Sequence, residues 1–120
     1  MTLEVAESYC AELSESGFSD WRMPTICELR TLIQNCSSTE SGGSVGLTDD
    51  CLFLGCWAQD SCPIDYYKEY SKLGDKSVLW SSSLVPENTN NAWCVIFSGA
   101  EISYRSTNDK IYVRCVRNAE

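Results

Sequence analysis

Cysteine is the residue type with the most distinctive chemistry in this sequence. The chain holds eight cysteines and no histidine. No two cysteines stand at C-x-x-C spacing, so a zinc ribbon or a zinc finger has little support. An even number of cysteines without metal spacing indicates disulfide bonds, and hence an oxidising, extracellular compartment. The cysteines are Cys10, Cys27, Cys36, Cys51, Cys56, Cys62, Cys94 and Cys115.

Catalytic patterns are weak by comparison. Without histidine, neither a Ser–His–Asp nor a Cys–His pairing can form. Gly42 and Gly43 lack the lysine and the helix that follow a phosphate-binding loop. The adjacent carboxylates Asp49 and Asp50 could do acid–base work, but a solvated acidic turn is the simpler interpretation. The sequence therefore favours a non-catalytic protein, with an enzyme as the weakest alternative.

Aromatic side chains in the middle of the chain form one candidate contact surface. Trp57, Tyr66, Tyr67 and Tyr70 lie in an irregular region, where burial in a core is less obligatory. Tyr and Trp offer large, rigid contact area at binding surfaces. We expect these four residues to contact a ligand; local packing of the loop on itself is the alternative.

The same region carries several carboxylates. Together they could hold a structural Ca²⁺, which prefers hard oxygen ligands, although a solvated acidic face is the simpler interpretation. These residues are Asp49, Asp50, Asp60, Asp65 and Glu69.

Length and charge limit the remaining function classes. A chain of 120 residues fits one domain with a thin core. The formal net charge of −8 argues against nucleic acids and anionic membranes as partners, because both recruit Lys and Arg. No apolar stretch of about 20 residues predicts membrane insertion, and there is no signal peptide. If the domain is exported, we expect its targeting segment to lie outside these 120 residues.

Periodicity predicts two helices in the first third of the chain. Thr2 can cap a first helix that carries Cys10 on its buried stripe and ends at Gly17. Thr25 and Glu28 have the spacing of a capping box, which predicts a second helix ending near Asn35.

An irregular region, 36–77, follows these helices, and then the pattern changes to strands. Four strands are predicted, at 77–81, 92–98, 101–105 and 111–117. The second is apolar on both faces, which is typical of a central strand. The order predicts an α+β fold, in which two helices pack on a small, twisted antiparallel sheet beside a long loop held by disulfides.

Five strings of residues, in this order along nearly the whole chain, resemble the DUF1566 family, which is also called the Lcl C-terminal domain. They are Ala6-x-x-Tyr9-Cys10, Trp21-Arg22-Met23-Pro24-Thr25-x-x-Glu28-Leu29-x-x-Leu32, Trp80-Ser81-Ser82-Ser83, Asn91-Ala92-Trp93-x-Val95-x-Phe97-x-Gly99 and Tyr112-Val113-Arg114-Cys115-Val116-Arg117. The resemblance implies one C-type-lectin-like domain over residues 1–120, from a bacterial surface or secreted protein, and some members are adhesins. It also implies that Trp21, Trp80 and Trp93, which fall inside these strings, belong to the core.

The sequence departs from the family at its start. Members usually open with a strand that pairs with the last strand, and this chain starts at the helix. That departure would leave 111–117 with an unpaired edge, a site prone to strand addition. We expect an upstream segment, a partner or a second copy of the chain to complete the sheet.

The resemblance also favours one disulfide, Cys10–Cys115, among the 105 connectivities that eight cysteines allow. Proximity along the chain suggests Cys36–Cys51 and Cys56–Cys62. Cys27 and Cys94 are left either as a bridge from helix to sheet or as two buried thiols.

Two polar turns resemble the places where sugar-binding C-type lectins hold Ca²⁺ and grip sugar hydroxyls. Glu87, Asn88 and Asn90 precede the central strand and are candidate ligand-binding residues. Glu87 and Asn88, with Asn108 and Asp109 before the last strand, could supply oxygen ligands to Ca²⁺. Turn residues of ordinary polarity are the alternative interpretation.

These features predict an extracellular binding module for adhesion or recognition. Its ligand would be a glycan or a protein, bound through the long loop and the turns at 84–91 and 106–110. The alternative from another class is a structural domain that forms homo-oligomers through its last strand and loops.

Overall fold

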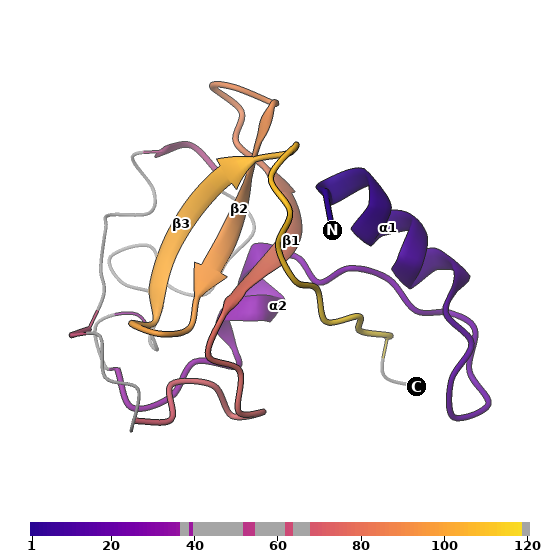
Figure 1. Ribbon diagram of the computed structural model, residues 1–120, viewed down its shortest axis with the longest axis horizontal. Helices are drawn as coiled ribbons and strands as arrows, with labels where there is room; N and C mark the ends of the chain where they lie inside the picture. Colours follow the sequence, from indigo (N-terminus) through magenta and orange to yellow (C-terminus); the bar gives the residue numbers. More distant parts are fainter. Residues whose placement is uncertain (37–38, 40–51, 55–61, 64–67, 119–120) are drawn as a thin grey trace.

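The computed structural model describes residues 1–36, 39, 52–54, 62–63 and 68–118, and within them it shows two helices and three strands (Figure 1). The helices are α1 (Leu3–Glu12) and α2 (Ile26–Arg30), and the strands are β1 (Val78–Leu84), β2 (Asn91–Ile96) and β3 (Glu101–Ser106). The strands form one antiparallel sheet in the order β1-β2-β3. The predicted α+β fold, with helices on a small antiparallel sheet, is confirmed.

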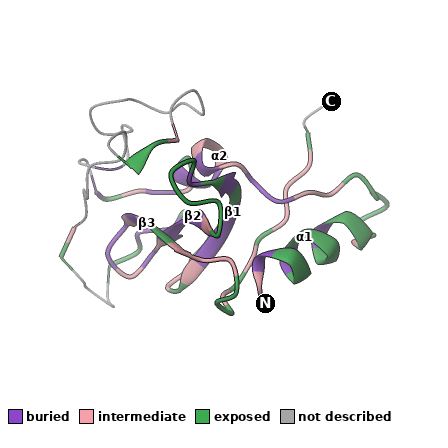
Figure 2. Ribbon diagram, turned by 90° about the horizontal axis from the view of Figure 1, so that it is seen from above, coloured by how far each residue is buried: buried purple, intermediate pink, exposed green. Residues whose placement is uncertain are grey.

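The central strand β2 is buried on both faces, as its sequence predicts. Trp93 and Val95 pack in one apolar cluster with Ile26 and Leu29 of α2. On the opposite face, Cys94 packs in a second cluster with Ala6, Cys10 and Trp80. The two helices therefore cover opposite faces of the sheet, and Figure 2 shows the buried residues concentrated in the strands between them.

Helix α1 begins at its predicted cap but ends earlier than predicted. The Thr2 hydroxyl accepts a hydrogen bond from the Val5 amide at 3.4 Å. Leu3, Ala6 and Cys10 are the buried stripe, whereas Val5 and Tyr9 are 53% and 46% exposed. The chain leaves the helix at Leu13, which is extended. Gly17, the predicted end, instead occupies a turn with φ +82°.

Helix α2 carries the predicted capping box, with both of its reciprocal hydrogen bonds formed. A second contact fixes the same carboxylate: Arg22 donates to the two Glu28 oxygens at 2.6 and 2.8 Å. The helix ends at Arg30 and not near Asn35, which lies in the left-handed region at φ +62°.

The last segment, 111–117, is not the continuous strand that its alternating pattern predicts. Tyr112 makes one parallel bridge with Leu79, and Val116 makes one antiparallel bridge with Arg22. The segment leaves β1 to reach the link before α2, so no single segment of the described residues pairs with it along its length. At its start, the Met1 and Ile111 backbones exchange two hydrogen bonds of 2.8 and 2.9 Å. Completion of the sheet by an added segment stays a prediction.

Two disulfides lie within the described residues. Cys10–Cys115 is confirmed and joins α1 to the last segment across 105 residues. Cys36 pairs with Cys62, so the predicted Cys36–Cys51 and Cys56–Cys62 bridges are wrong. Cys51 and Cys56 lie outside the described residues. Cys94 keeps its thiol, so no bridge joins it to Cys27.

Neither of the two helices in the described part of the chain has the length and apolar character needed to cross a bilayer.

Removal of the Cys10–Cys115 bond should destabilise the fold strongly. Because the bond closes a loop of about 106 residues, the Cys10→Ser/Cys115→Ser variant should lose about 4–5 kcal/mol of unfolding free energy. Urea denaturation under oxidising conditions measures this loss. The Val5→Ala/Tyr9→Ala variant changes two exposed residues of the same helix and should stay within about 1 kcal/mol of the wild type. A cysteine variant as stable as this control would contradict the assigned role of the bond.

Acid should weaken the Arg22–Glu28 contact. Hydrogen bonding from Arg22 lowers the pKa of Glu28 from 4.5 to about 2. A lowered carboxyl pKa contributes stability that is present above pH 4.5 and fades as the pH falls towards 2. Glu28→Gln should therefore cost on the order of 1 kcal/mol at neutral pH, since the side chain is 38% exposed and partly screened.

Unfolding free energies of the wild type and Glu28→Gln, measured across pH 2–7, test this dependence. The difference between them should close at the acid end. Glu7→Gln is the matched control, because Glu7 has no ion pair among the described residues. A difference that is constant over the whole pH range would rule out the proposed linkage.

Candidate binding site

The two polar turns predicted to bind ligand lie side by side at one end of the sheet, the upper end in Figure 1. Asn91 pairs with Ser106 in the β2–β3 ladder. Beyond this pair, the Thr107 amide donates a 2.7 Å hydrogen bond to the Asn90 carbonyl. The turn before β2 and the turn after β3, which are separated by two strands in the sequence, thus meet at one end of the sheet.

Several predicted site residues are engaged within these turns. The Asn88 side-chain oxygen accepts from the Asn90 amide at 3.1 Å, and Ser106 Oγ accepts from the Asn108 amide at 3.3 Å. Both carboxylate oxygens of Glu87 accept from the Leu54 amide, at 3.1 and 2.9 Å. The Asn88 and Ser106 contacts are ordinary hydrogen bonds within polar turns. The Glu87 carboxylate instead anchors the backbone of Leu54.

No hydrogen bond among the described residues brings the two halves of the predicted Ca²⁺ set together. Glu87 is committed to a backbone donor, and the Asp109 amide closes a turn on the Ser106 carbonyl. Among the described residues, no three Asp, Glu or Cys side chains gather as a metal site would require. Ca²⁺ binding by Glu87, Asn88, Asn108 and Asp109 therefore stays a prediction.

A hollow of about 310 Å³ lies between the turns and the first half of α1. We name it the turn hollow. Of the predicted site residues that the structure describes, only Asn108 lines it. Its lining residues are Thr2, Leu3, Glu4, Glu7, Leu84, Thr89, Thr107 and Asn108.

A second hollow, of about 450 Å³, is also lined by Glu7. We name it the tryptophan hollow, because half-buried Trp21 lines it. The other lining residues are Glu7, Ala11, Arg22, Met23, Thr25 and Ser82. The core assignment of Trp21 is thus wrong, whereas those of Trp80 and Trp93 are confirmed.

The sheet explains why the two hollows adjoin. The β1–β2 register is irregular between Trp80 and Leu84, but contacts with α1 place Trp80, Ser82 and Leu84 on the same side of the strand. Helix α1 covers Trp80 completely and leaves Ser82 and Leu84 exposed. The uncovered end of this face, bounded by Glu7 of α1, forms a groove that we name the α1–β1 groove.

The α1–β1 groove is acidic. Glu4 and Glu7 line it, and neither takes part in an ion pair among the described residues. Arg22 also lines it, but its guanidinium is bonded to Glu28 and to Asn118. The groove therefore offers two carboxylate acceptors that form no ion pair among the described residues, beside an arginine whose charge is already balanced by Glu28.

The predicted aromatic surface is only partly testable. Tyr70 is 1% exposed and belongs to the core, so its assignment as a contact residue is wrong. The Gln34 amide donates to the Tyr70 carbonyl at 2.9 Å, which brings the tyrosine ring against α2. The Tyr70 hydroxyl donates to the Pro63 carbonyl at 2.7 Å. Trp57, Tyr66 and Tyr67 lie outside the described residues.

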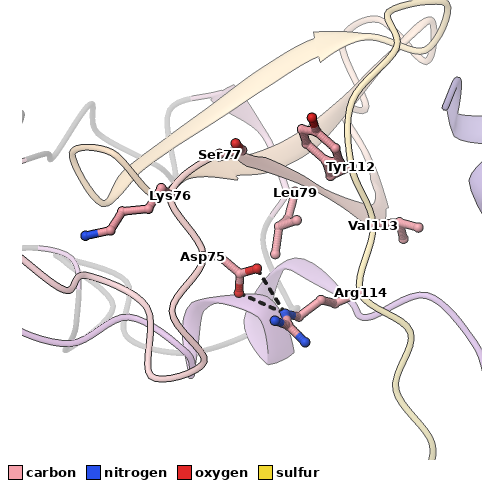
Figure 3. Close-up of a pocket in the computed structure, with 7 residues that line it drawn as sticks. All are labelled: Asp75, Lys76, Ser77, Leu79, Tyr112, Val113 and Arg114. Carbon is pink, nitrogen blue, oxygen red and sulfur yellow. Dashed lines mark hydrogen bonds and ion pairs between the residues drawn. The ribbon is translucent and has the colours of Figure 1, made fainter. Parts of the chain in front are cut away.

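A separate groove of about 300 Å³ lies between the start of β1 and the last segment (Figure 3). Figure 3 shows Asp75 and Arg114 facing each other across its lower end, where Arg114 Nε donates to both Asp75 oxygens at 3.0 and 2.9 Å. Ser71 Oγ donates to the same carboxylate at 3.0 Å. This pairing neutralises the groove's carboxylate and ties the last segment to the chain before β1.

The thiol of Cys94 has no chemistry to offer at a surface. It is buried beneath α1, and burial raises its pKa to about 12. At neutral pH it stays protonated, and a protonated thiol is a poor nucleophile and a poor metal ligand.

Comparison with known proteins identifies a family for this chain. The Lcl C-terminal domain matches residues 1–117. No curated protein and no solved structure matches.

Proposed function

Because the chain belongs to the Lcl C-terminal domain family, we propose that it is an extracellular, non-catalytic binding module of C-type-lectin-like architecture that recognises a glycan. The α1–β1 groove is the observation that carries this proposal. Sugars present many hydroxyls, and a site that binds them needs several fixed polar groups around a small apolar floor.

The turn hollow has these properties. Glu4 and Glu7 offer carboxylate acceptors, Asn108 offers an amide, and Leu84 supplies apolar surface. The hydroxyls of Thr89 and Thr107 add donors and acceptors. The turns that carry them are held by backbone and side-chain hydrogen bonds, so little order has to be gained on binding.

Covalent cross-links support an extracellular location. The two disulfides of the described residues are bonds that persist in oxidising compartments and are rare in the cytosol. The formal net charge of −8 disfavours sulfated glycans, nucleic acids and anionic lipid surfaces as partners.

A structural assembly domain is the second candidate. Tyr112 is 67% exposed at the edge of the sheet, where the last segment meets β1 by a single bridge. An exposed aromatic beside an incompletely paired edge favours contact with another chain. A defined homo-oligomer lost in Tyr112→Ala would support this function.

A glycan array tests the proposed function directly. The protein should bind one class of uncharged sugars, and Asn108→Ala should weaken that binding about tenfold, since it removes a polar contact in the turn hollow. Val5→Ala changes an exposed residue of α1 that lines neither hollow and serves as the control. If the protein binds no glycan on the array and sediments as a defined oligomer, the result would contradict glycan recognition and favour the structural assembly function.

The same array, read with Ca²⁺ and with a chelator, tests the predicted metal set. Binding that needs Ca²⁺ and is lost in Glu87→Ala and Asp109→Ala would establish metal bridging. Binding that a chelator leaves unchanged would assign recognition to the protein groups alone.

A further inference from the structure

We propose that Trp21 forms a second sugar subsite, so that the ligand is an uncharged oligosaccharide lying along the α1–β1 groove from the turns to this ring. This inference rests on the proposed function and extends it. It adds a residue, Trp21, that the sequence places in the core.

The groove has the length for more than one sugar. Glu7 lines both hollows, and Ser82 and Leu84 lie two residues apart on the same exposed face of β1. The two hollows therefore adjoin at Glu7, and the proposed ligand would pass this side chain on its way from Asn108 to Trp21.

The chemistry of the tryptophan hollow suits a sugar ring. The Trp21 indole N–H already donates to the Phe18 carbonyl at 3.1 Å, which leaves the apolar ring surface for contact. One face of a pyranose carries C–H bonds of slight positive charge, which are attracted to the negative face of an aromatic ring. Around it, Ser82 Oγ donates to the Pro24 carbonyl and keeps lone pairs free to accept from sugar hydroxyls.

Charge distinguishes the ligand class. Within the part of the chain that the structure describes, Glu7 has no ion-pair partner, so sulfated or uronic sugars would meet an uncompensated negative charge. Arg22 and Glu28 cancel each other beside Trp21, which leaves one carboxylate in this hollow. A single carboxylate is a weak attractor for a basic peptide, whereas it can accept two hydroxyls of a neutral sugar.

The ring is held in place before any ligand arrives. Its neighbour Arg22 is fixed to Glu28, and the Arg22 and Val116 backbones exchange two 2.7 Å hydrogen bonds. The Ser82 amide donates to the Pro24 carbonyl at 2.8 Å, which ties the link after Trp21 to β1. A site organised in advance gains affinity because less entropy is lost on binding.

Titration of the intact chain with neutral hexose and N-acetylhexosamine oligomers of increasing length tests the subsite. The proteins are the wild type, Trp21→Ala, Trp21→Phe, Glu7→Gln and Asn108→Ala, with Val5→Ala on the outer side of α1 as the control. Trp21→Ala should weaken binding of the longer oligomers about tenfold, and Trp21→Phe should retain most of it, because an aromatic face remains. Monosaccharide binding should depend on Asn108 and not on Trp21.

Intrinsic fluorescence gives a readout that a folding defect would not imitate. Longer oligomers should change the emission of the wild type, and Trp21→Phe should abolish that change while far-ultraviolet circular dichroism and the urea unfolding midpoint stay native. Sugar binding that is independent of chain length and of Trp21 would overturn the subsite and leave the proposed function standing. Absence of sugar binding by the wild type would overturn both. Binding of a Lys/Arg-rich decapeptide in place of sugars, lost in Trp21→Ala, would overturn the sugar subsite in favour of a cationic ligand.

Discussion

The Cys10–Cys115 bond is the constraint on which the rest of this structure depends. Helix α1 has ten residues and buries only three side chains against the sheet. An isolated helix of that length is marginal in water, and the burial of three small or medium side chains contributes only a few kcal/mol. The cross-link places α1 against the last segment, which in turn bridges to both β1 and the link before α2.

The groove follows from this placement. Since α1 is fixed over Trp80, it stands beside the uncovered end of β1 and not on top of it. One wall of the groove is therefore a helix whose position is set covalently, and the other is the edge of a well-buried sheet. Rigid walls are what a small site needs when its individual contacts are weak, and this links the disulfide to recognition as well as to stability.

Local sequence signals were sufficient for some elements. The Thr25–Glu28 capping box and the Thr2 cap are formed by residues three apart, so spacing alone predicts them. The two-sided apolar pattern of β2 likewise identifies the central strand. The Cys10–Cys115 pair came from resemblance to the family, since chain proximity gives no reason to choose it.

Features that depend on distant contacts were missed. Cys36 pairs with Cys62 and not with Cys51, and Cys62 is itself held by a backbone hydrogen bond to the distant Gly99, a contact that chain proximity cannot predict. Tyr70 is buried for a similar reason: backbone bonds from Gln34 and to Leu32 hold its segment against the end of α2. The sequence gives only a weak indication that Trp21 is partly exposed. The residue lies in an extended link, where no helix or strand requires both faces of its ring to be covered.

Amide hydrogen exchange on α1 and β2, compared between the wild type and Cys10→Ser/Cys115→Ser, tests the central claim most directly. If the covalent bond positions the helix, the amides of α1 should lose their protection while those of β2 stay substantially slower to exchange. Equal loss in both elements, or protection of α1 that survives without the bond, would contradict the account.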